Sequence, residues 1–366
     1  MKIGILTFPK MTSYGCSLQM YAMYRAVEQL GVEAEIINYR NEYMKARRHT
    51  STGRSRIRVE AVLRVAATKT LHLRQILAFR RFEARMCQYP PQITTDKKVL
   101  AEAAKRYDGV ICGSDQVWNP LITDTDLSFF LDFCPPAAKR IAYAPSFGIS
   151  EFSEEFTEKI RPELERFRHL SVREPAGARY VEKLVNRKVA TVLDPTFLIA
   201  PGEWEALEKK HPMANGRYIF CFPVRNSAAV IKYARELAQK RGITLIVAEG
   251  NFIRKLRNKD RNMKYALDLS PEEWLYMLHH AEAVVTNSFH GAAFSIHYRK
   301  DFYLEGTYHN ANSRLDQLME ICGLQDRVLR PDCKNWDDSI DFDAVEARLR
   351  PARQESLAYL KQAVQQ

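Results

Sequence analysis

Short apolar runs alternate with segments of helical spacing through most of the chain. In the first half the runs predict strands at residues 2–8, 33–38, 109–112, 140–144, 169–173 and 190–193. Between the first two, Leu18, Ala22, Ala26 and Leu30 recur every four residues, which marks one face of a helix that ends at Gly31. Alternation of this kind predicts layers of helices on parallel sheets.

The same alternation restarts in the second half, after a polar and broken segment. It predicts helices near residues 228–240 and 271–280, and strands at residues 218–224, 243–249, 283–287 and 302–305. A chain of 366 residues is also too long for one ordinary core. We therefore predict an α/β fold with two Rossmann-like domains that face a central cleft, a GT-B-like arrangement.

The expected domain boundaries follow from this pattern. They are an N-terminal domain at 1–199 with a basic helical insertion at about 45–90, a linker at 200–216, and a C-terminal domain at 217–342. A final helical stretch, residues 343–366, is expected to pack back on the N-terminal domain. Ligands of such folds bind beyond the carboxyl ends of the strands, so polar residues at those ends are the candidates for chemistry.

The most polar strand end is the stretch TNSFHG at residues 286–291, which follows an apolar run. Asn287, Ser288 and His290 are candidate site residues, because imidazole titrates near neutral pH and can act as an acid or a base. A tight turn capped by Ser or Asn explains the local pattern equally well. His279 and His280 end a predicted helix, where the dipole favours positive charge, and need no functional role.

A second strand end, GSDQVW at residues 113–118, follows the same logic. Here Ser114 and Asp115 are candidates to bind or deprotonate a hydroxyl, and Trp118 is a candidate to stack on a sugar face. The alternative is a helix cap followed by a tryptophan of the core.

The loop after the first strand opens a helix and contains a glycine that allows backbone N–H groups to approach an anion. Gly15, Ser17 and Gln19 are therefore candidate substrate contacts, although a plain capping turn fits as well.

Arginines follow two strands and begin one helix. Arg173, Arg225 and Arg314 are candidates to bind carboxylate or phosphate, because the guanidinium group donates two parallel hydrogen bonds. The turn at Asp194 and Pro195 is interpreted as architectural, closing the first domain.

The net charge of the chain indicates which classes of partner it binds. Lys and Arg number 55 against 44 Asp and Glu, a net charge of +11, which favours a phosphorylated substrate, nucleic acid or an anionic membrane. Between residues 45 and 85 the chain carries twelve basic residues and two acidic ones, interleaved with apolar positions. This predicts basic amphipathic helices that either contact anionic lipid or form a solvated surface. No nucleic-acid reader motif accompanies the charge, so we expect no nucleic-acid partner.

The seven cysteines are scattered, odd in number and include no C-x-x-C pair, so we expect neither a zinc ribbon nor a disulfide framework. A reducing cytoplasm fits this usage best. No apolar stretch is long enough to span a membrane, and residues 2–6 begin directly as a strand rather than as a signal peptide.

Several segments, taken in order, resemble the polysaccharide pyruvyl transferase family. They run from residue 2 to about 318 and read KIGILTF, YGCSLQMYAMYRAVEQLG, DGVICGSDQVWNP, RIAYAPSFG, LSVREPAGARYV, VLDPTFL, AEAVVTNSFHGAAFSIHYRKDF and NSRLDQL. One departure is Ser13, where relatives often carry Asn before Tyr-Gly, so the resemblance assigns no role to that loop.

The resemblance implies transfer of the pyruvyl group of phosphoenolpyruvate to two hydroxyls of a sugar, with no cofactor. It implies acid–base work by His290 and Asp115, and anion binding by Arg173, Arg225 and Arg314. The implied acceptor is a bacterial surface polysaccharide or its precursor linked to lipid pyrophosphate, used at the inner face of the cell membrane. The alternatives are a nucleotide-sugar glycosyltransferase on the same scaffold and a non-catalytic, membrane-associated component of polysaccharide assembly.

Overall fold

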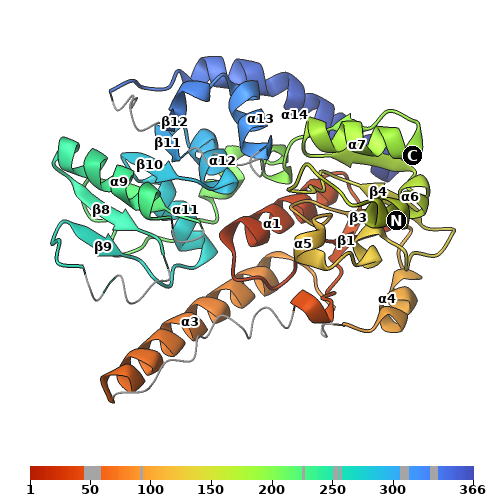
Figure 1. Ribbon diagram of the computed structural model, residues 1–366, viewed down its shortest axis with the longest axis horizontal. Coiled ribbons are helices and arrows are strands. Elements are labelled where there is room, and N and C mark those ends of the chain that lie inside the picture. Colours follow the sequence, from red (N-terminus) through yellow and green to blue (C-terminus); the bar gives the residue numbers. More distant parts are fainter. Residues whose placement is uncertain are drawn as a thin grey trace.

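Two parallel six-stranded sheets form the centre of the protein. The computed structural model describes residues 1–44, 59–90, 94–224, 227–249, 255, 258–305, 313–329 and 337–366, with the backbone alone for residues 59–69 and 313. Figure 1 shows one sheet in each half of the molecule, with helices on the faces of both. The predicted α/β fold with two Rossmann-like domains is therefore confirmed.

The N-terminal sheet has the order β2-β1-β3-β4-β5-β6 and is parallel throughout. Its strands are β1 (Lys2–Leu6), β2 (Glu33–Ile36), β3 (Gly109–Cys112), β4 (Lys139–Ala142), β5 (His169–Val172) and β6 (Ala190–Thr191). The chain leaves β1 toward β2 on one side and reaches β3 on the other. This reversal leaves a crevice at the carboxyl ends of β1 and β3.

The C-terminal sheet has the order β12-β11-β10-β7-β8-β9, which is the classical Rossmann order when the strands are renumbered from β7. Its strands are β7 (Tyr218–Phe222), β8 (Thr244–Val247), β9 (Met263–Tyr265), β10 (Ala283–Thr286), β11 (Phe302–Glu305) and β12 (Val328–Leu329). The strand order reverses between β7 and β10, so the second crevice lies where these two strands end. The edge strands β9 and β12 were not predicted.

Helices of the N-terminal half are α1 (Tyr14–Glu28), α3 (Val59–Met86), α4 (Lys97–Ala104), α5 (Pro120–Thr123), α6 (Glu154–Glu165) and α7 (Pro175–Val185), with 3-10 turns η1 (Leu127–Phe130) and η2 (Pro195–Leu198). Helix α3 projects from the body in Figure 1. Its last turns are nevertheless anchored, because Phe79 and Phe82 are buried and Arg85 pairs with Glu272 of the C-terminal half.

The remaining helices are α8 (Pro201–Glu205), α9 (Ala228–Arg241), α11 (Pro271–His279), α12 (Phe289–His297), α13 (Ser313–Cys322) and α14 (Phe342–Gln365), with the 3-10 turn η4 (Gln325–Arg327). The predicted linker thus begins with a helix, and Trp204 of that helix packs on Tyr21 and on Phe294, one from each half. Helix α14 returns to the N-terminal half, where Tyr359 donates to the Ala142 carbonyl (2.9 Å).

The two halves share one apolar core. Tyr14 of α1 stacks on Trp274 of α11 with centroids 5.3 Å apart, and its hydroxyl donates to the Leu269 carbonyl (3.1 Å). Buried residues from both halves belong to the same cluster. The contact between the halves is therefore built like a domain interior, which fixes how the two crevices face each other.

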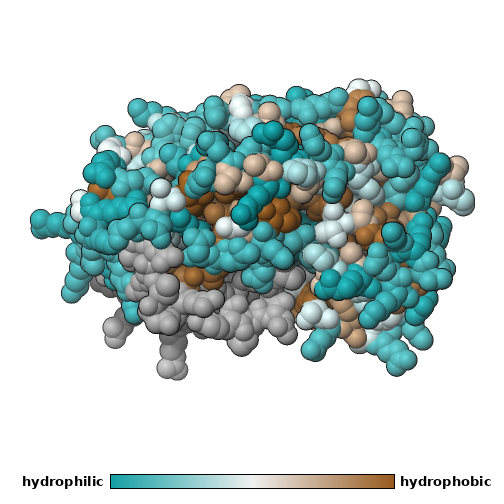
Figure 2. Space-filling view, turned by 90° about the horizontal axis from the view of Figure 1, so that it is seen from above, coloured by the Kyte–Doolittle hydropathy of each residue, from teal (hydrophilic) through white to brown (hydrophobic). Residues whose placement is uncertain are grey.

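The face of the molecule in Figure 2 is largely hydrophilic, and its apolar residues form small separate patches. Among the described helices, none has the length and apolar content that a membrane crossing requires.

Candidate functional site

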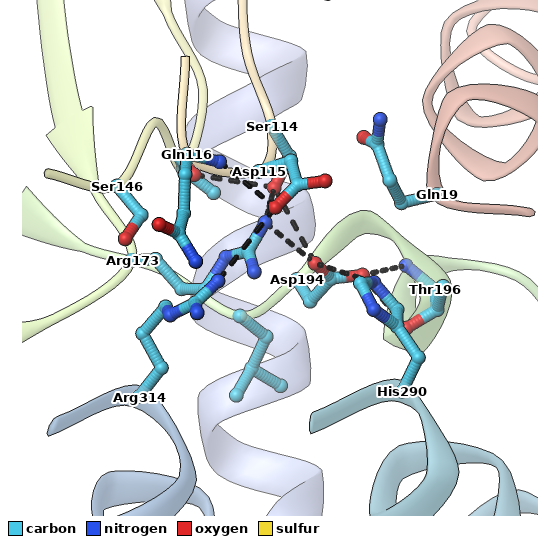
Figure 3. A network of polar contacts seen from close by, with 12 residues as sticks. Gln19, Ser114, Asp115, Gln116, Ser146, Arg173, Asp194, Thr196, His290 and Arg314 are labelled. Atoms are coloured by element: carbon cyan, nitrogen blue, oxygen red, sulfur yellow. Dashed lines mark hydrogen bonds and ion pairs between the residues drawn. The ribbon is translucent and has the colours of Figure 1, made fainter. Parts of the chain in front are cut away.

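The two crevices meet at a cluster of buried polar residues. Figure 3 shows side chains from N-terminal strand ends and from the C-terminal helices α12 and α13 pointing toward one another. Asp115 follows β3, Arg173 follows β5, and Asp194 precedes η2. His290 and Arg314 lie in the first turns of α12 and α13. We call these five residues the interlobe cluster.

His290 is positioned by the cap of its own helix. Ser288 is the N-cap residue of α12, and its hydroxyl accepts a hydrogen bond from the Gly291 N–H (3.3 Å). The capping turn and the candidate imidazole are therefore parts of one motif. The cap orients the first turn of α12 so that His290 points toward the N-terminal half.

The imidazole rests against the backbone of the other half. His290 is only 8% exposed. A Cβ atom added to Gly15 of α1 would lie 2.2 Å from His290 Nδ1, so only glycine allows this approach. Its Nε2 lies 3.8 Å from Asp194 Oδ2 and has no hydrogen-bond partner within the described residues. The ring is thus buried between the halves, beside charged groups rather than in hydrocarbon alone.

Asp194 holds two sides of the interlobe cluster together. Its Oδ1 accepts from the Thr196 N–H (3.0 Å) and the Thr196 hydroxyl (2.8 Å), while Oδ2 lies 2.9 Å from Arg173 Nη2. The turn is architectural, as interpreted from the sequence, because Asp194 caps η2, and its other carboxylate oxygen also makes Asp194 part of the interlobe cluster. The available signal was an acidic residue directly after the predicted strand at residues 190–193, at the edge where the other candidates lie.

The two arginines retain unused hydrogen-bond donors. Arg173 is 2% exposed, donates to the Ser114 hydroxyl and lies over the Phe289 ring (5.1 Å), yet its Nε and Nη1 have no partner among the described residues. Arg314 Nη1 lies 3.6 Å from Asp115 Oδ1, and its Nε also has no partner in the part of the chain that the structure describes. Buried donors without acceptors are costly, so this arrangement is suited to an anionic ligand that supplies the missing acceptors.

Asp115 is the acidic residue of the interlobe cluster that hydrogen-bonds to α1. Its Oδ2 accepts from the Cys16 thiol (3.1 Å), and its Oδ1 accepts from the Gln116 N–H (2.8 Å). Its backbone has a φ of 71°, a left-handed conformation that directs the chain sharply away from β3. The carboxylate thereby lies in the interlobe cluster, next to Arg314.

Burial and mutual charge set the ionisation of the interlobe cluster. Burial lowers the pKa of His290, and Asp194 and Asp115 offset part of that shift. Burial alone would raise the pKa of Asp115, but Arg173, His290 and Arg314 bring it below its ordinary value. At neutral pH the imidazole is therefore neutral and the carboxylate is ionised.

A pocket adjoins the interlobe cluster. Its lining combines polar side chains, those of Arg173, Asp194, Arg314 and Gln317, with apolar ones, those of Val192, Leu193, Phe197, Phe289, Leu318 and Ile321. The pocket therefore offers hydrogen-bond donors for an anion beside apolar surface.

Three predicted contacts point elsewhere. Trp118 is 0% exposed, its Nε1 donates to the Phe129 carbonyl (2.8 Å), and its ring stacks on Phe130, so it has no face for a sugar and is a core residue. The Ser17 hydroxyl donates to Glu83 of α3 (2.7 Å). Gln19 donates to the Thr7 hydroxyl (2.9 Å). These two side chains stabilise the loop and helix around the interlobe cluster.

Two further predicted residues support the two crevices, Asn287 in the C-terminal half and Ser114 in the N-terminal half, and a third lies outside the described residues. The Asn287 amide accepts from the Val224 N–H (2.7 Å) and donates to Glu305 (3.1 Å), which ties together the ends of β7, β10 and β11. Ser114 accepts from Arg173 and donates to the Ala144 carbonyl (3.1 Å). Arg225 is outside the residues that the structure describes.

Comparison with protein families decides the relationship. The family model described as polysaccharide pyruvyl transferase matches residues 14–304, which include every residue of the interlobe cluster except Arg314. The chain belongs to the polysaccharide pyruvyl transferase family. A comparison with curated protein sequences gives no match.

Solved structures resemble this pyruvyl transferase family member at the level of the fold. A putative UDP-N-acetylglucosamine 2-epimerase from Listeria monocytogenes has a TM-score of 0.51 at 10% identity, covering 99% of this chain and 90% of that chain. The E. coli heptosyltransferase WaaC with ADP has a TM-score of 0.43 at 14% identity, covering 96% and 100%. At 10% identity the likeness to the epimerase shows a shared fold alone.

Proposed function

We propose that the protein transfers the pyruvyl group of phosphoenolpyruvate to two hydroxyls of a sugar, forming a cyclic ketal and releasing phosphate. The observation that carries the proposal is the set of buried nitrogens on Arg173, Arg314 and His290 that have no acceptor among the described residues, in a chain of the pyruvyl transferase family. Phosphoenolpyruvate presents a carboxylate and a phosphate, and guanidinium groups bind both kinds of anion.

The proton transfers follow from balancing the atoms of ketal formation. Two acceptor hydroxyls each lose a proton as their oxygens bond to C2 of the enol. One proton ends on the methylene carbon, which becomes a methyl group, and the other leaves with phosphate as the C2–O bond breaks. We assign the first deprotonation to Asp115, which is ionised at rest because of its cationic neighbours.

His290 is assigned the proton for the methylene carbon. The ring is neutral in the free protein because burial lowers its pKa. A bound trianion counteracts this shift, since nearby negative charge favours the imidazolium form. The arginines stabilise phosphate as it departs. Asp194, bonded to Arg173 and close to His290, is a positioning residue in this scheme.

Family membership favours this function over that of a nucleotide-sugar glycosyltransferase, because the family model that matches residues 14–304 is the one described as polysaccharide pyruvyl transferase. Thermal-shift measurements separate the two functions, because stabilisation by a uridine or guanosine diphosphate sugar but not by phosphoenolpyruvate would support the glycosyltransferase.

The acceptor and the pathway are part of the proposal. We infer a sugar linked to lipid pyrophosphate, used in the synthesis of a bacterial capsule, exopolysaccharide or other surface glycan at the inner face of the membrane. The net charge of +11 and the basic segment at residues 45–85 support an anionic, membrane-bound acceptor. A protein that binds vesicles but has no turnover would instead be a non-catalytic assembly component.

The test combines turnover with substitution. Incubation with phosphoenolpyruvate and a panel of lipid-linked or aryl glycosides is expected to release phosphate and add a pyruvyl mass to one acceptor. His290→Ala and Arg225→Ala are expected to abolish both signals, whereas the control His211→Ala, in the segment between the domains, retains them. Turnover at the wild-type rate in His290→Ala and Arg225→Ala refutes these assignments.

A further inference from the structure

Three potential metal ligands gather away from the interlobe cluster. Glu208 lies just beyond α8, His279 ends α11, and His280 is the next residue. Their ligand atoms all lie within 4.8 Å of one another. His279 Nδ1 is 2.7 Å from Glu208 Oε1, and His280 Nδ1 is 3.7 Å from Glu208 Oε2. The 2.7 Å contact is a hydrogen bond, and a cation bound by the three side chains would replace it at the roughly 3.3 Å that separates neighbouring ligands of a tetrahedral zinc ion.

Aromatic stacking holds both imidazole rings in place. His279 lies parallel to Tyr298 with centroids 4.2 Å apart, and His280 lies parallel to Tyr276 at 3.9 Å. His280 Nδ1 is also 3.1 Å from the Tyr276 carbonyl oxygen. A metal bound through Nδ1 would replace this contact, whereas one bound through Nε2 would keep it as the bond that orients the ring. Rings fixed in advance lose less entropy when they bind an ion.

The surroundings supply negative charge and partial access to solvent. The Glu208 side chain is 9% exposed, whereas the His279 and His280 side chains are 28% and 44% exposed, so an ion can enter from the histidine side. The carboxyl end of α11 adds its partial negative charge. One ammonium opposes a cation here: burial lowers the pKa of Lys300, and Asp301 and Glu208 partly offset that shift. We therefore expect micromolar rather than nanomolar affinity.

We propose that Glu208, His279 and His280 form a site for a divalent transition metal, with zinc as the ion that fits best. Two imidazoles and one carboxylate are a ligand set of zinc, and water completes the tetrahedron. Helix α11 runs back from the carboxyl edge of the sheet to the start of β10, so the site lies at the amino edge, opposite His290. Its consequence is architectural, because the ion would fasten the segment after α8, which connects the two domains, to the C-terminal domain.

Calorimetric titration of the untagged full chain tests the site, after stripping with a chelator. One Zn²⁺ is expected to bind per chain, and Co²⁺ is expected to give the intense visible absorption of a tetrahedral complex. Glu208→Gln and His279→Gln, which keep the shape of each side chain, are each expected to weaken zinc binding by about tenfold or more. His72→Gln, which changes an exposed histidine of α3, is the matched control and is expected to bind as the wild type does.

Circular dichroism and melting of the metal-free variants show whether each remains folded. If His279→Gln unfolds, His280→Gln takes its place, because that side chain is the more exposed of the two. Failure of the wild type to bind zinc at micromolar concentrations overturns the proposal. Wild-type affinity in the folded Glu208 and histidine variants also overturns it. Neither result bears on pyruvyl transfer, so this test stands apart from the proposed function.

Discussion

The absence of one side chain decides where the imidazole of His290 lies. Gly15 has no Cβ atom, and any Cβ there would overlap His290 Nδ1 at 2.2 Å. Separations below about 3 Å are not tolerated between such atoms, so a larger residue must displace the ring or the helix. The contact is between the two halves, and its loss would therefore change the interlobe cluster before it changed either sheet.

Gly15→Ala is expected to leave the protein folded and to lower phosphoenolpyruvate turnover by about a hundredfold, because a shift of about 1 Å in a reacting group costs that much. The measurement is phosphate release at saturating substrate, with circular dichroism as the check on folding. Gly202→Ala, in α8, is the matched control, since nothing lies within 4 Å of its added methyl group. Equal turnover in the two variants would show that the close contact between Gly15 and His290 is not needed for activity.

Asp194→Asn is expected to lower the free energy of unfolding by about 3 kcal/mol, because it removes the charge that compensates the buried Arg173. The exposed ion pair of Arg299 and Asp343 provides the comparison, and Asp343→Asn is expected to change stability little. Urea unfolding of both variants measures the difference. Equal stability of the two would show that Asp194 is not the main counter-charge of Arg173.

Buried histidines make stability depend on pH. Burial lowers the pKa of His297 to about 3, and the ring stacks on Phe197 next to Asp194 and Thr196. In the unfolded chain His297 is therefore protonated as the pH falls through about 6.5, whereas in the folded chain it stays neutral until the pH approaches about 3. Stability from this group is full above pH 6.5 and falls by about 1.4 kcal/mol per pH unit as the pH drops toward 3. His290 shifts in the same direction.

Urea unfolding at pH 7 and pH 5 checks this dependence. The wild type is expected to lose stability between the two values, and His297→Gln is expected to lose clearly less. Asp115 does not interfere, because its lowered pKa places its titration below this window. The same loss in both proteins would mean that His297 is protonated in the folded state.

At the scale of elements, the sequence predicts the long strands and the edge at which the site lies. Strands such as β1 and β10 are continuous apolar runs that end in polar residues, as buried parallel strands do. The edge strands β9 and β12 could not be recognised, because they have three and two residues and owe their conformation to pairing with β8 and β11. The parallel order of the sheet then brings Asp115, Arg173 and Asp194 together.

The sequence did not predict in which direction the side chains of a helix point. Ser17 and Gln19 lie in the first turns of α1, near the crevice, yet they point to α3 and to β1 because the apolar face of the helix sets its rotation. Trp118 faces inward for the same kind of reason, since Phe130 and Phe147 surround it. Position along the chain predicts nearness to the site, whereas packing decides which residues enter it.

Helix α3 carries a testable surface. Leu73 and Leu77 are 55% and 38% exposed and lie one turn apart, with Arg74, Arg80 and Arg81 also exposed. We expect this face to contact anionic vesicles, with leucines in the interface and guanidiniums at the head groups. Changing both leucines to Asp is expected to reduce co-sedimentation by about tenfold or more, because each buried leucine contributes at least about 1.5 kcal/mol.

Leu121→Asp is the control for that measurement, since Leu121 is 64% exposed on α5 and not on α3. Its co-sedimentation is expected to match that of the wild type. Vesicles without anionic lipid, or high salt, are expected to weaken binding of all variants. If the double variant of α3 binds as well as the control, the surface is a solvated one.

At the scale of the whole molecule, the two halves behave as one core. Tyr14, Trp274 and Phe294 belong to a cluster that continues from α1 through α11 and α12. Helix α14 adds a second connection, because Ser356 accepts from the Leu193 N–H (2.9 Å) after the chain has passed through the C-terminal half. Independent unfolding of either half would expose this shared apolar surface.

Calorimetric melting is therefore expected to give one cooperative transition rather than two. Tyr14→Ala is expected to lower the melting temperature and to broaden or split the transition, because it removes a stacked ring from the interface, at a cost of about 3 kcal/mol or more. Two separate transitions in the wild type would contradict the view of one core.

The close approach of His290 to α1 also makes the His290 ring a reporter of the separation between the two halves. If the halves move apart by about the width of a methyl group, the ring no longer contacts the glycine of the opposite half. Its nitrogen resonances in an NMR spectrum would then move toward those of a hydrated imidazole. Opening and closing could be followed at this single nucleus, without attaching a probe to either lobe.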